Sequence, residues 1–175
     1  MNYFEFYGIP IAFKMDIAQL KRLFLAKSRQ YHPDFYAQSN DEAQEQALEM
    51  ATYNNKAYQT LSDLDQRIAY ILTLKGLMTE GERYELPPAF LMQMMDINEE
   101  IMELEANKVT PTKIDQLNQN LQNIENELLQ TTQPLIDNYT ENTEQTQDLI
   151  KIKEFYYKKR YLLRIQKSIR NFAPQ

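Results

Sequence analysis

The stretch "RQYHPDFYAQSND" contains the single histidine of this 175-residue chain, His32, which is followed directly by Pro33 and Asp34. A histidine beside a carboxylate could act as a general base. That role requires an activated nucleophile and an orienting group in the same site. Nothing in the sequence marks the neighbouring serines, Ser28 and Ser39, as activated. We therefore predict that the chain is not an enzyme and has no catalytic residues.

A bound metal ion is not expected either. Zinc sites in proteins draw on several histidine, cysteine or carboxylate ligands, and this chain offers one histidine and no cysteine. The absence of cysteine also excludes disulfides, cysteine nucleophiles and thiolate ligands for iron. We predict no cofactor. A reducing, cytoplasmic location is compatible with this composition.

The overall composition favours a helical protein with a packed core. Hydrophobic residues make up 43% of the chain and there are only three glycines. The net charge of −6 makes nucleic acid a poor default partner for the whole molecule. The N-terminal residues lack the basic leader and apolar run of a secretory signal. Since no window approaches the ~18 apolar residues of a membrane span, we expect a soluble protein.

Apolar spacing and capping residues predict the helices of the N-terminal part. The first long helix starts at Asp16 and stops at His32, because the residue before a proline is disfavoured in a helix. A loop follows, and Ser39 is predicted to cap the next helix. That helix carries an inward stripe that consists of Ala43, Ala47, Met50, Asn54, Ala57 and Leu61. Two antiparallel helices joined by a loop are the simplest arrangement, and a further short helix ends near Gly76.

The C-terminal part predicts three more helices that close into a three-helix bundle. They open at Pro88, at Thr110–Pro111 and near Thr146, and Pro134 is expected to break or kink the end of the second. The third runs to about Phe172. The expected organisation is a domain over 1–76, a linker over 77–87 and a second domain over 88–175. The fold class is all-α.

The short stretches around His32 carry a resemblance to a known family. The residues "RQYHPD" and "NNKAYQTLSD", with "YFEFYGIP" in place of the usual first helix, resemble the J domain of DnaJ-type co-chaperones. "RIAYIL", a linker and "FLMQMMDINEEIMELE" extend the match over nearly the full chain. They look like the HscB-type J proteins of iron–sulfur cluster assembly. That family joins an N-terminal J domain to a C-terminal three-helix bundle.

The resemblance implies a co-chaperone with two partners. The J domain would dock on a chaperone ATPase of the DnaK/HscA type and stimulate ATP hydrolysis, and the bundle would deliver an IscU-like iron–sulfur scaffold protein to it. The implied ATPase-binding residues are His32, Pro33, Asp34, Lys21, Arg22, Lys27 and Arg29. A rigid Pro33 turn loses little entropy on docking, and Asp34 can form a charge-assisted contact. Phe35 stands where many J domains carry a lysine.

The helix from Pro88 predicts a second surface from its geometry. At ~100° per residue, Leu91, Met92, Met95 and Met102 point away from the predicted core stripe, together with several acids. An exposed apolar patch rimmed by charge suggests an interface, and methionines repack easily; the alternative is that the J domain covers part of this face. The resemblance places scaffold binding here, at Leu91, Met92, Met95, Asp96, Glu99 and Glu103, with Phe155 of the last helix beside them.

The last helix is basic, with eight Lys or Arg and one acid between Lys151 and Arg170. Interleaved tyrosines make RNA or an anionic membrane surface an alternative partner. We favour a structural role, in which the acidic helix over Asp96–Glu105 lies alongside it. The expected partners therefore include no nucleic acid and no membrane. A J protein with a different client is a further alternative.

Overall fold

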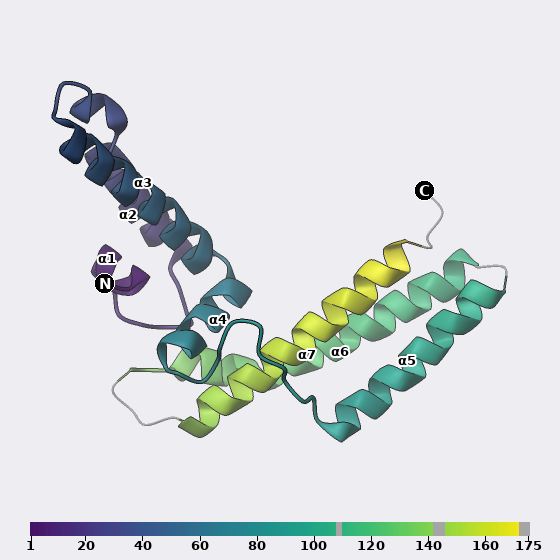
Figure 1. The fold of residues 1–175 in the computed structure, drawn as a ribbon. Coiled ribbons are helices and arrows are strands. Elements are labelled where there is room, and N and C mark those ends of the chain that lie inside the picture. Colours follow the sequence, from purple (N-terminus) through teal and green to yellow (C-terminus); the bar gives the residue numbers. More distant parts are fainter. Residues whose placement is uncertain (108–109, 142–145, 172–175) are drawn as a thin grey trace. The chain divides into compact units, whose positions relative to one another are not determined.

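The structure is a computed structural model that describes residues 1–107, 110–141 and 146–171. Within these ranges the secondary structure is helical and contains no strand, so the predicted all-α fold class is confirmed (Figure 1). The elements are α1 (Tyr3–Tyr7), α2 (Ile17–Gln30), the short 3-10 helix η1 (Pro33–Tyr36), α3 (Asp41–Ser62), α4 (Leu64–Leu74), α5 (Pro88–Ala106), α6 (Pro111–Asn138) and α7 (Thr146–Arg170). The predicted helix end at Phe172 lies outside the described residues.

The chain divides into two compact units, which are described separately below. The first comprises Met1–Gly76 and the described part of the segment that begins at Ile136. The second comprises Leu77–Leu135 and the described residues of α7. The first unit therefore also takes up a short segment from the domain predicted over 88–175.

In the first unit, α2 and α3 form the predicted antiparallel hairpin (Figure 1). Asp16 caps α2 by accepting a hydrogen bond from the Gln19 amide at 2.9 Å. The prediction that Ser39 caps α3 was wrong. The cap is Asn40, whose side-chain oxygen accepts from the Ala43 amide at 2.9 Å, while the carbonyl of Ser39 accepts from Gln44. Both residue types cap helices well, so composition could not decide between neighbours.

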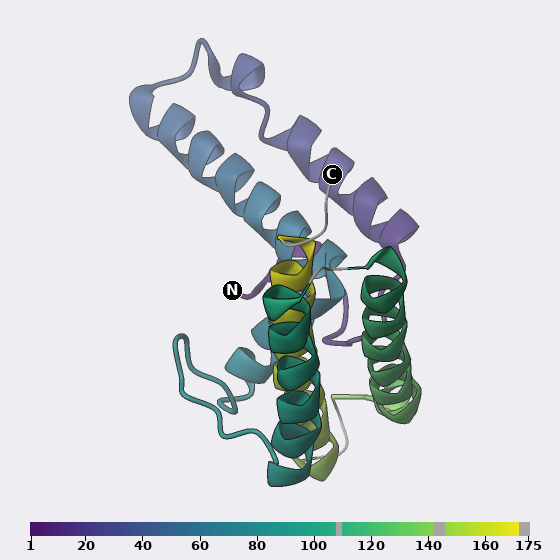
Figure 2. The same ribbon diagram turned by 90° about the vertical axis from the view of Figure 1, so that its right-hand side faces the viewer.

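The second unit is the predicted three-helix bundle, in which α5, α6 and α7 run side by side (Figures 1 and 2). Its core repeats every three or four residues along each helix, as expected for one apolar stripe per helix. The buried core residues are Phe90, Met94, Ile97 and Ile101 from α5, Ile114, Leu117, Leu121 and Ile124 from α6, and Leu162, Ile165 and Ile169 from α7.

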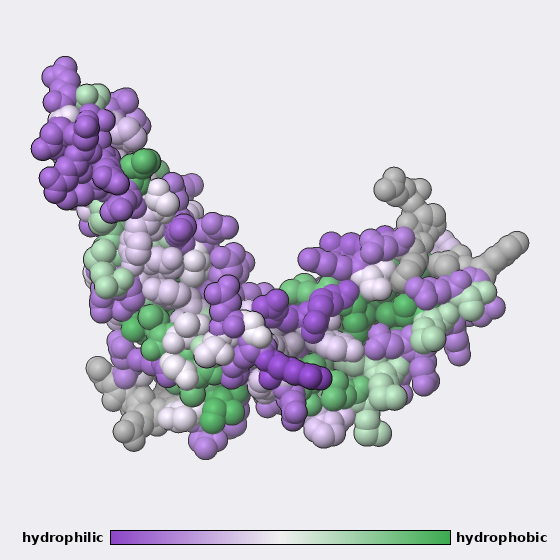
Figure 3. Space-filling view, in the orientation of Figure 1, coloured by the Kyte–Doolittle hydropathy of each residue, from purple (hydrophilic) through white to green (hydrophobic). Residues whose placement is uncertain are grey.

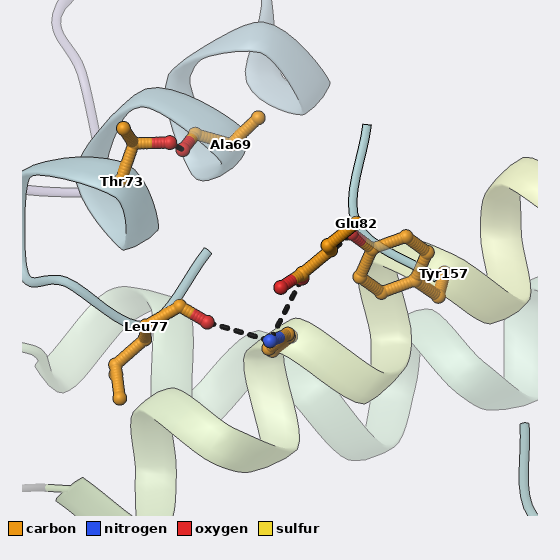
Figure 4. Close-up of polar contacts among 6 residues, drawn as sticks. Ala69, Thr73, Leu77, Glu82 and Tyr157 are labelled. Atoms are coloured by element: carbon orange, nitrogen blue, oxygen red, sulfur yellow. Dashed lines mark hydrogen bonds and ion pairs between the residues drawn. The ribbon is translucent and has the colours of Figure 1, made fainter. Parts of the chain in front are cut away.

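Two details of the second unit differ from the sequence-based expectations. Of the two effects expected of Pro134, a break is wrong, since α6 continues through the proline to Asn138, and a kink stays a prediction. The segment predicted as a linker packs on α7. The Lys153 ammonium donates to the Leu77 carbonyl at 2.6 Å and pairs with the Glu82 carboxylate at 2.8 Å (Figure 4). Such contacts fix the segment to the bundle.

Candidate functional site

The turn around His32 connects α2 to α3 and is hydrogen-bonded to the end of α2. The helix ends because Pro33 has no amide to continue it. Tyr36 folds back and donates its hydroxyl to the Gln30 carbonyl at 3.1 Å, and the Phe35 amide donates to the His32 carbonyl at 3.1 Å. The sequence analysis did not single out Tyr36, although a tyrosine two residues after Asp34 can make such a contact. The turn is therefore held in one geometry.

The His32 side chain caps the 3-10 helix that contains Asp34. In the neutral ring, Nδ1 accepts a hydrogen bond from the Asp34 amide at 3.3 Å, and Asp34 Oδ2 lies 3.6 Å from the same nitrogen. The Asp34 side chain is 89% exposed and that of His32 is 54% exposed. The imidazole thus positions the turn while the carboxylate points into solvent, free to meet a cation of a partner.

The exposed groups around the turn include one large apolar side chain. The surface at this end of the hairpin is mostly hydrophilic (Figure 3). Phe35 is nevertheless 74% exposed, and its ring lies 6.3 Å from that of His32 in an edge-to-face arrangement. The position after Asp34 therefore presents an aromatic ring where a lysine would present charge.

The four basic residues predicted on α2 are not equivalent. Lys21, Arg22 and Arg29 are exposed. Lys27 is half-buried, and its ammonium lies 4.9 Å from the ring centre of Phe6 and 5.8 Å from that of Tyr31. Cation–π contacts of this kind stabilise a folded chain. Lys27 therefore has a structural role that periodicity alone could not reveal, because Phe6 belongs to α1.

A buried polar cluster holds the hairpin together beneath the turn. The Asn54 amide donates to the Phe24 carbonyl at 3.1 Å and to the Ser28 hydroxyl at 3.0 Å, and its oxygen accepts from the Tyr7 hydroxyl at 2.7 Å. Asn54 is 1% exposed. Burial raises the pKa of Tyr7, with a smaller contribution from Tyr58. One side chain thus ties α1 and α2 to α3, which fixes the direction in which the turn points.

The predicted second surface lies along α5. Leu91, Met92 and Met95 are 40%, 67% and 60% exposed, and the acids Asp96, Glu99 and Glu103 are exposed as well. Figure 3 shows moderately hydrophobic groups along this helix. The exposed side chains occupy the side opposite the buried Phe90, Met94, Ile97 and Ile101. The helix therefore presents an apolar patch bordered by carboxylates within its own unit.

Phe155 differs from the other residues predicted for this surface. It is 3% exposed and lines a hollow of about 470 Å³ together with Gln93 of α5 and Leu128 of α6. Phe155 therefore lies close to α5, as expected, but it is buried, and its part in scaffold binding stays a prediction. It forms the wall of a depression between the helices, because its position on α7 faces the bundle.

Two basic side chains of α7 form ion pairs with acids that lie outside α5. Lys153 pairs with Glu82, and Lys158 pairs with Glu154 at 2.6 Å. Lys158 also lies 5.5 Å from the ring centre of Phe90, so α5 does run beside α7. The prediction that the acidic helix lies alongside α7 is therefore confirmed.

The described part of the chain offers neither a cluster of metal ligands nor a membrane-spanning helix. In that part, no group of three or more His, Asp or Glu side chains is placed to hold a metal ion. None of the helices over residues 1–107, 110–141 and 146–171 combines the length and hydropathy needed to cross a bilayer.

Comparisons with known proteins cover both sequence and fold. Residues 86–170 match the family described as "HSCB C-terminal oligomerisation domain". A "Co-chaperone protein HscB homolog" of Vibrio cholerae serotype O1 (strain M66-2) is 38% identical over 107 residues, which are 61% of this chain and 63% of that protein. The "Co-chaperone protein HscB" of Proteus mirabilis (strain HI4320) is 38% identical over 106 residues, 60% of this chain and 61% of that protein. The chain thus matches less than two thirds of the length of these relatives.

Two solved structures share the fold over nearly the whole chain. "Chaperone HscB from Vibrio cholerae" has a TM-score of 0.72 at 24% identity and covers 98% of this chain and 96% of its own. The crystal structure of "human co-chaperone protein HscB" has a TM-score of 0.76 at 24% identity, with coverages of 97% and 81%. The resemblance to HscB-type proteins is confirmed: residues 86–170 match the HscB C-terminal domain family, and the chain as a whole shares the fold of the HscB structures.

Proposed function

We propose that this chain is an HscB-type co-chaperone that stimulates the ATPase of a DnaK/HscA-type chaperone and delivers an IscU-like scaffold protein to it. It would hydrolyse nothing itself and would act in the maturation of iron–sulfur proteins. The names of the relatives support the co-chaperone class. The predicted division into a J domain over 1–76 and a scaffold-binding domain over 88–175, joined by 77–87, and the cytoplasmic location remain part of the proposal.

The observation that carries the ATPase part is the exposed Asp34 carboxylate on a turn with fixed geometry. Its amide is bonded to the His32 ring and the turn is fastened by Tyr36, so little conformational entropy is lost on docking. The exposed Lys21, Arg22 and Arg29 would attract an acidic partner surface and raise the association rate at low salt. A weaker contribution is expected of Lys27, whose charge rests on Phe6.

The test of this part is the steady-state ATPase rate of the cognate chaperone with the full chain added. Asp34→Asn should abolish the stimulation, because the amide keeps the size but loses the charge. Asp41→Asn makes the same chemical change at another exposed position and should stimulate like the unmodified chain. Equal stimulation by both variants would refute the role of Asp34.

A second variant separates capping from direct contact at His32. The oxygen of an asparagine can occupy the position of the imidazole Nδ1 and accept from the Asp34 amide. His32→Asn should therefore retain more stimulation than His32→Gln if the imidazole acts by positioning the turn. The reverse order would mean that the imidazole itself contacts the ATPase.

The scaffold part rests on the exposed patch of Leu91, Met92 and Met95 with its border of acids. Substituting these three residues by alanine should abolish binding of the scaffold in calorimetry, while basal ATPase stimulation persists. Ile150→Ala, an exposed apolar residue on α7, is the matched control. Undiminished scaffold binding by the triple variant would disprove the site.

The two alternative functions lead to different results in the same assays. A J protein with another client would stimulate the ATPase and fail to bind the scaffold. A protein that binds RNA or anionic membranes through α7 would show salt-sensitive binding to those surfaces and no ATPase stimulation. The internal pairing of Lys153 and Lys158 leaves less free charge for the latter function.

A further inference from the structure

A basic pocket lies between the segment over residues 81–86 and the side of α7 that this segment covers. Its volume is about 390 Å³. Three arginines line it, Arg83 from the segment and Arg160 and Arg164 from α7, together with Tyr84 and Tyr157. All of these residues belong to the second unit. Its lining residues include none of those named for the α5 patch or for the turn around His32.

The one acidic side chain among the lining residues is already engaged. Glu82 pairs with Lys153 at 2.8 Å and accepts a hydrogen bond from the Tyr157 hydroxyl at 2.8 Å (Figure 4). The Lys153 ammonium, helped by Tyr157, lowers the pKa of this carboxyl. The charge of Glu82 is therefore balanced by Lys153. No other residue that lines the pocket is acidic, so none balances the charge of the three arginines.

Aromatic contacts restrict the arginines of α7 before any ligand arrives. Arg160 donates to the Tyr156 hydroxyl at 2.8 Å and lies 5.5 Å from the centre of that ring. The Arg164 guanidinium lies 5.4 Å from the ring centre of Tyr161. A guanidinium has five N–H donors, so each keeps donors for a ligand, and less rotamer entropy is lost on binding.

Arg83 lies next to α7 because its neighbour, Tyr84, packs on that helix. The rings of Tyr84 and Tyr157 stack with their centres 4.3 Å apart and their planes 5° apart. Gly81, with a φ of +73°, supplies the turn that precedes this contact. Arg83 is thus carried on an anchored segment rather than on a free linker.

We propose that this pocket binds a phosphate group. A phosphate monoester carries about two negative charges at neutral pH and presents three strong acceptor oxygens. A ligand of this charge suits three guanidinium groups better than a ligand with a single carboxylate, which carries one negative charge. Arginine is the side chain suited to such planar, forked recognition of oxyanions. The phosphate could be the free ion or part of a nucleotide, and the two sources share this chemistry.

The test measures binding to the full chain at constant ionic strength, by the amide NMR shifts of residues 81–86. Inorganic phosphate should shift these amides saturably, whereas chloride and acetate should not. Adenosine monophosphate is the second arm. Tighter binding of the nucleotide than of the free ion assigns the site to a nucleotide phosphate, and equal affinity assigns it to the free ion. Either result supports a phosphate site.

Two pairs of substitutions distinguish binding in the pocket from general attraction to the basic helix. Arg160→Gln with Arg164→Gln should weaken phosphate binding by about tenfold or more, since hydrogen bonds between charged groups are the strong class. Lys167→Gln with Arg170→Gln removes the same charge from exposed positions of the same helix and should leave binding nearly unchanged. Circular dichroism verifies that both pairs fold.

Three outcomes would overturn the proposal. These are the absence of saturable shifts at residues 81–86, equal weakening by both pairs of substitutions, and binding of a glutamate-rich peptide in preference to phosphate. Equal weakening would mean that only the general charge of α7 matters. Because none of these measurements involves the chaperone or the scaffold, they are independent of the proposed co-chaperone function.

Discussion

Substituting Asn54 by alanine tests whether the buried polar cluster holds the α2–α3 hairpin. Asn54 is 1% exposed and its side chain makes three hydrogen bonds, to Phe24, Ser28 and Tyr7. Each such bond contributes about 1 kcal/mol net in folded proteins. The Tyr7 hydroxyl would keep a second acceptor, the Asn54 backbone carbonyl at 3.1 Å, so it is not left unpaired. We therefore expect a loss of about 2–3 kcal/mol in the free energy of unfolding of the first unit.

Hydrogen exchange is the suitable assay, because the two units need not unfold together and a single melting curve would mix them. Asn54→Ala should lower the opening free energies of the protected amides of α2 and α3. Asn55→Ala, at the exposed neighbouring position, should change them by less than about 0.5 kcal/mol. Combining Asn54→Ala with Tyr7→Phe should cost less than the sum of the two single changes, because the residues share a hydrogen bond. Equal effects of Asn54→Ala and Asn55→Ala would refute the clamping role.

Three further predictions follow from burial, charge and backbone chemistry. Phe155→Ala should lower the stability of the second unit by about 3–5 kcal/mol in urea unfolding, whereas Met92→Ala, 67% exposed, should be nearly neutral; comparable losses would contradict the burial of Phe155. Because Lys153 lowers the pKa of Glu82 from 4.5, their pair should stabilise the fold above about pH 4.5 and lose this contribution as the pH falls through the lowered pKa. Exchange protection of residues 81–84 should follow that change, and Glu82→Gln should remove the pH dependence. Pro134→Ala should raise the stability of α6 by about 1–3 kcal/mol by restoring a helix hydrogen bond, and a lowered midpoint in urea would show that the proline has a packing role.

The sequence alone determined the parts of this protein that depend on local chemistry. Pro33 ends the first long helix whatever packs around that helix, because the effect of proline on the backbone is local. The turn and its exposed Asp34 therefore follow from the tripeptide His32-Pro33-Asp34. The apolar repeat of the helix from Pro88 likewise separates a buried stripe from an outward face that carries Met92 and Met95. Both features were confirmed because they require only the geometry of one helix or one turn.

The tertiary structure decided which element covers each face. The apolar spacing predicts the helix that contains Phe155. Its burial depends on how α5 and α6 pack around that helix. Lys27 rests on Phe6, and Lys153 pairs with Glu82 rather than with an acid of α5, because segments distant in sequence bring those partners close. A hydrophobic or charged pattern states what a side chain requires of its surroundings, whereas the identity of the neighbour depends on the packing of the whole chain.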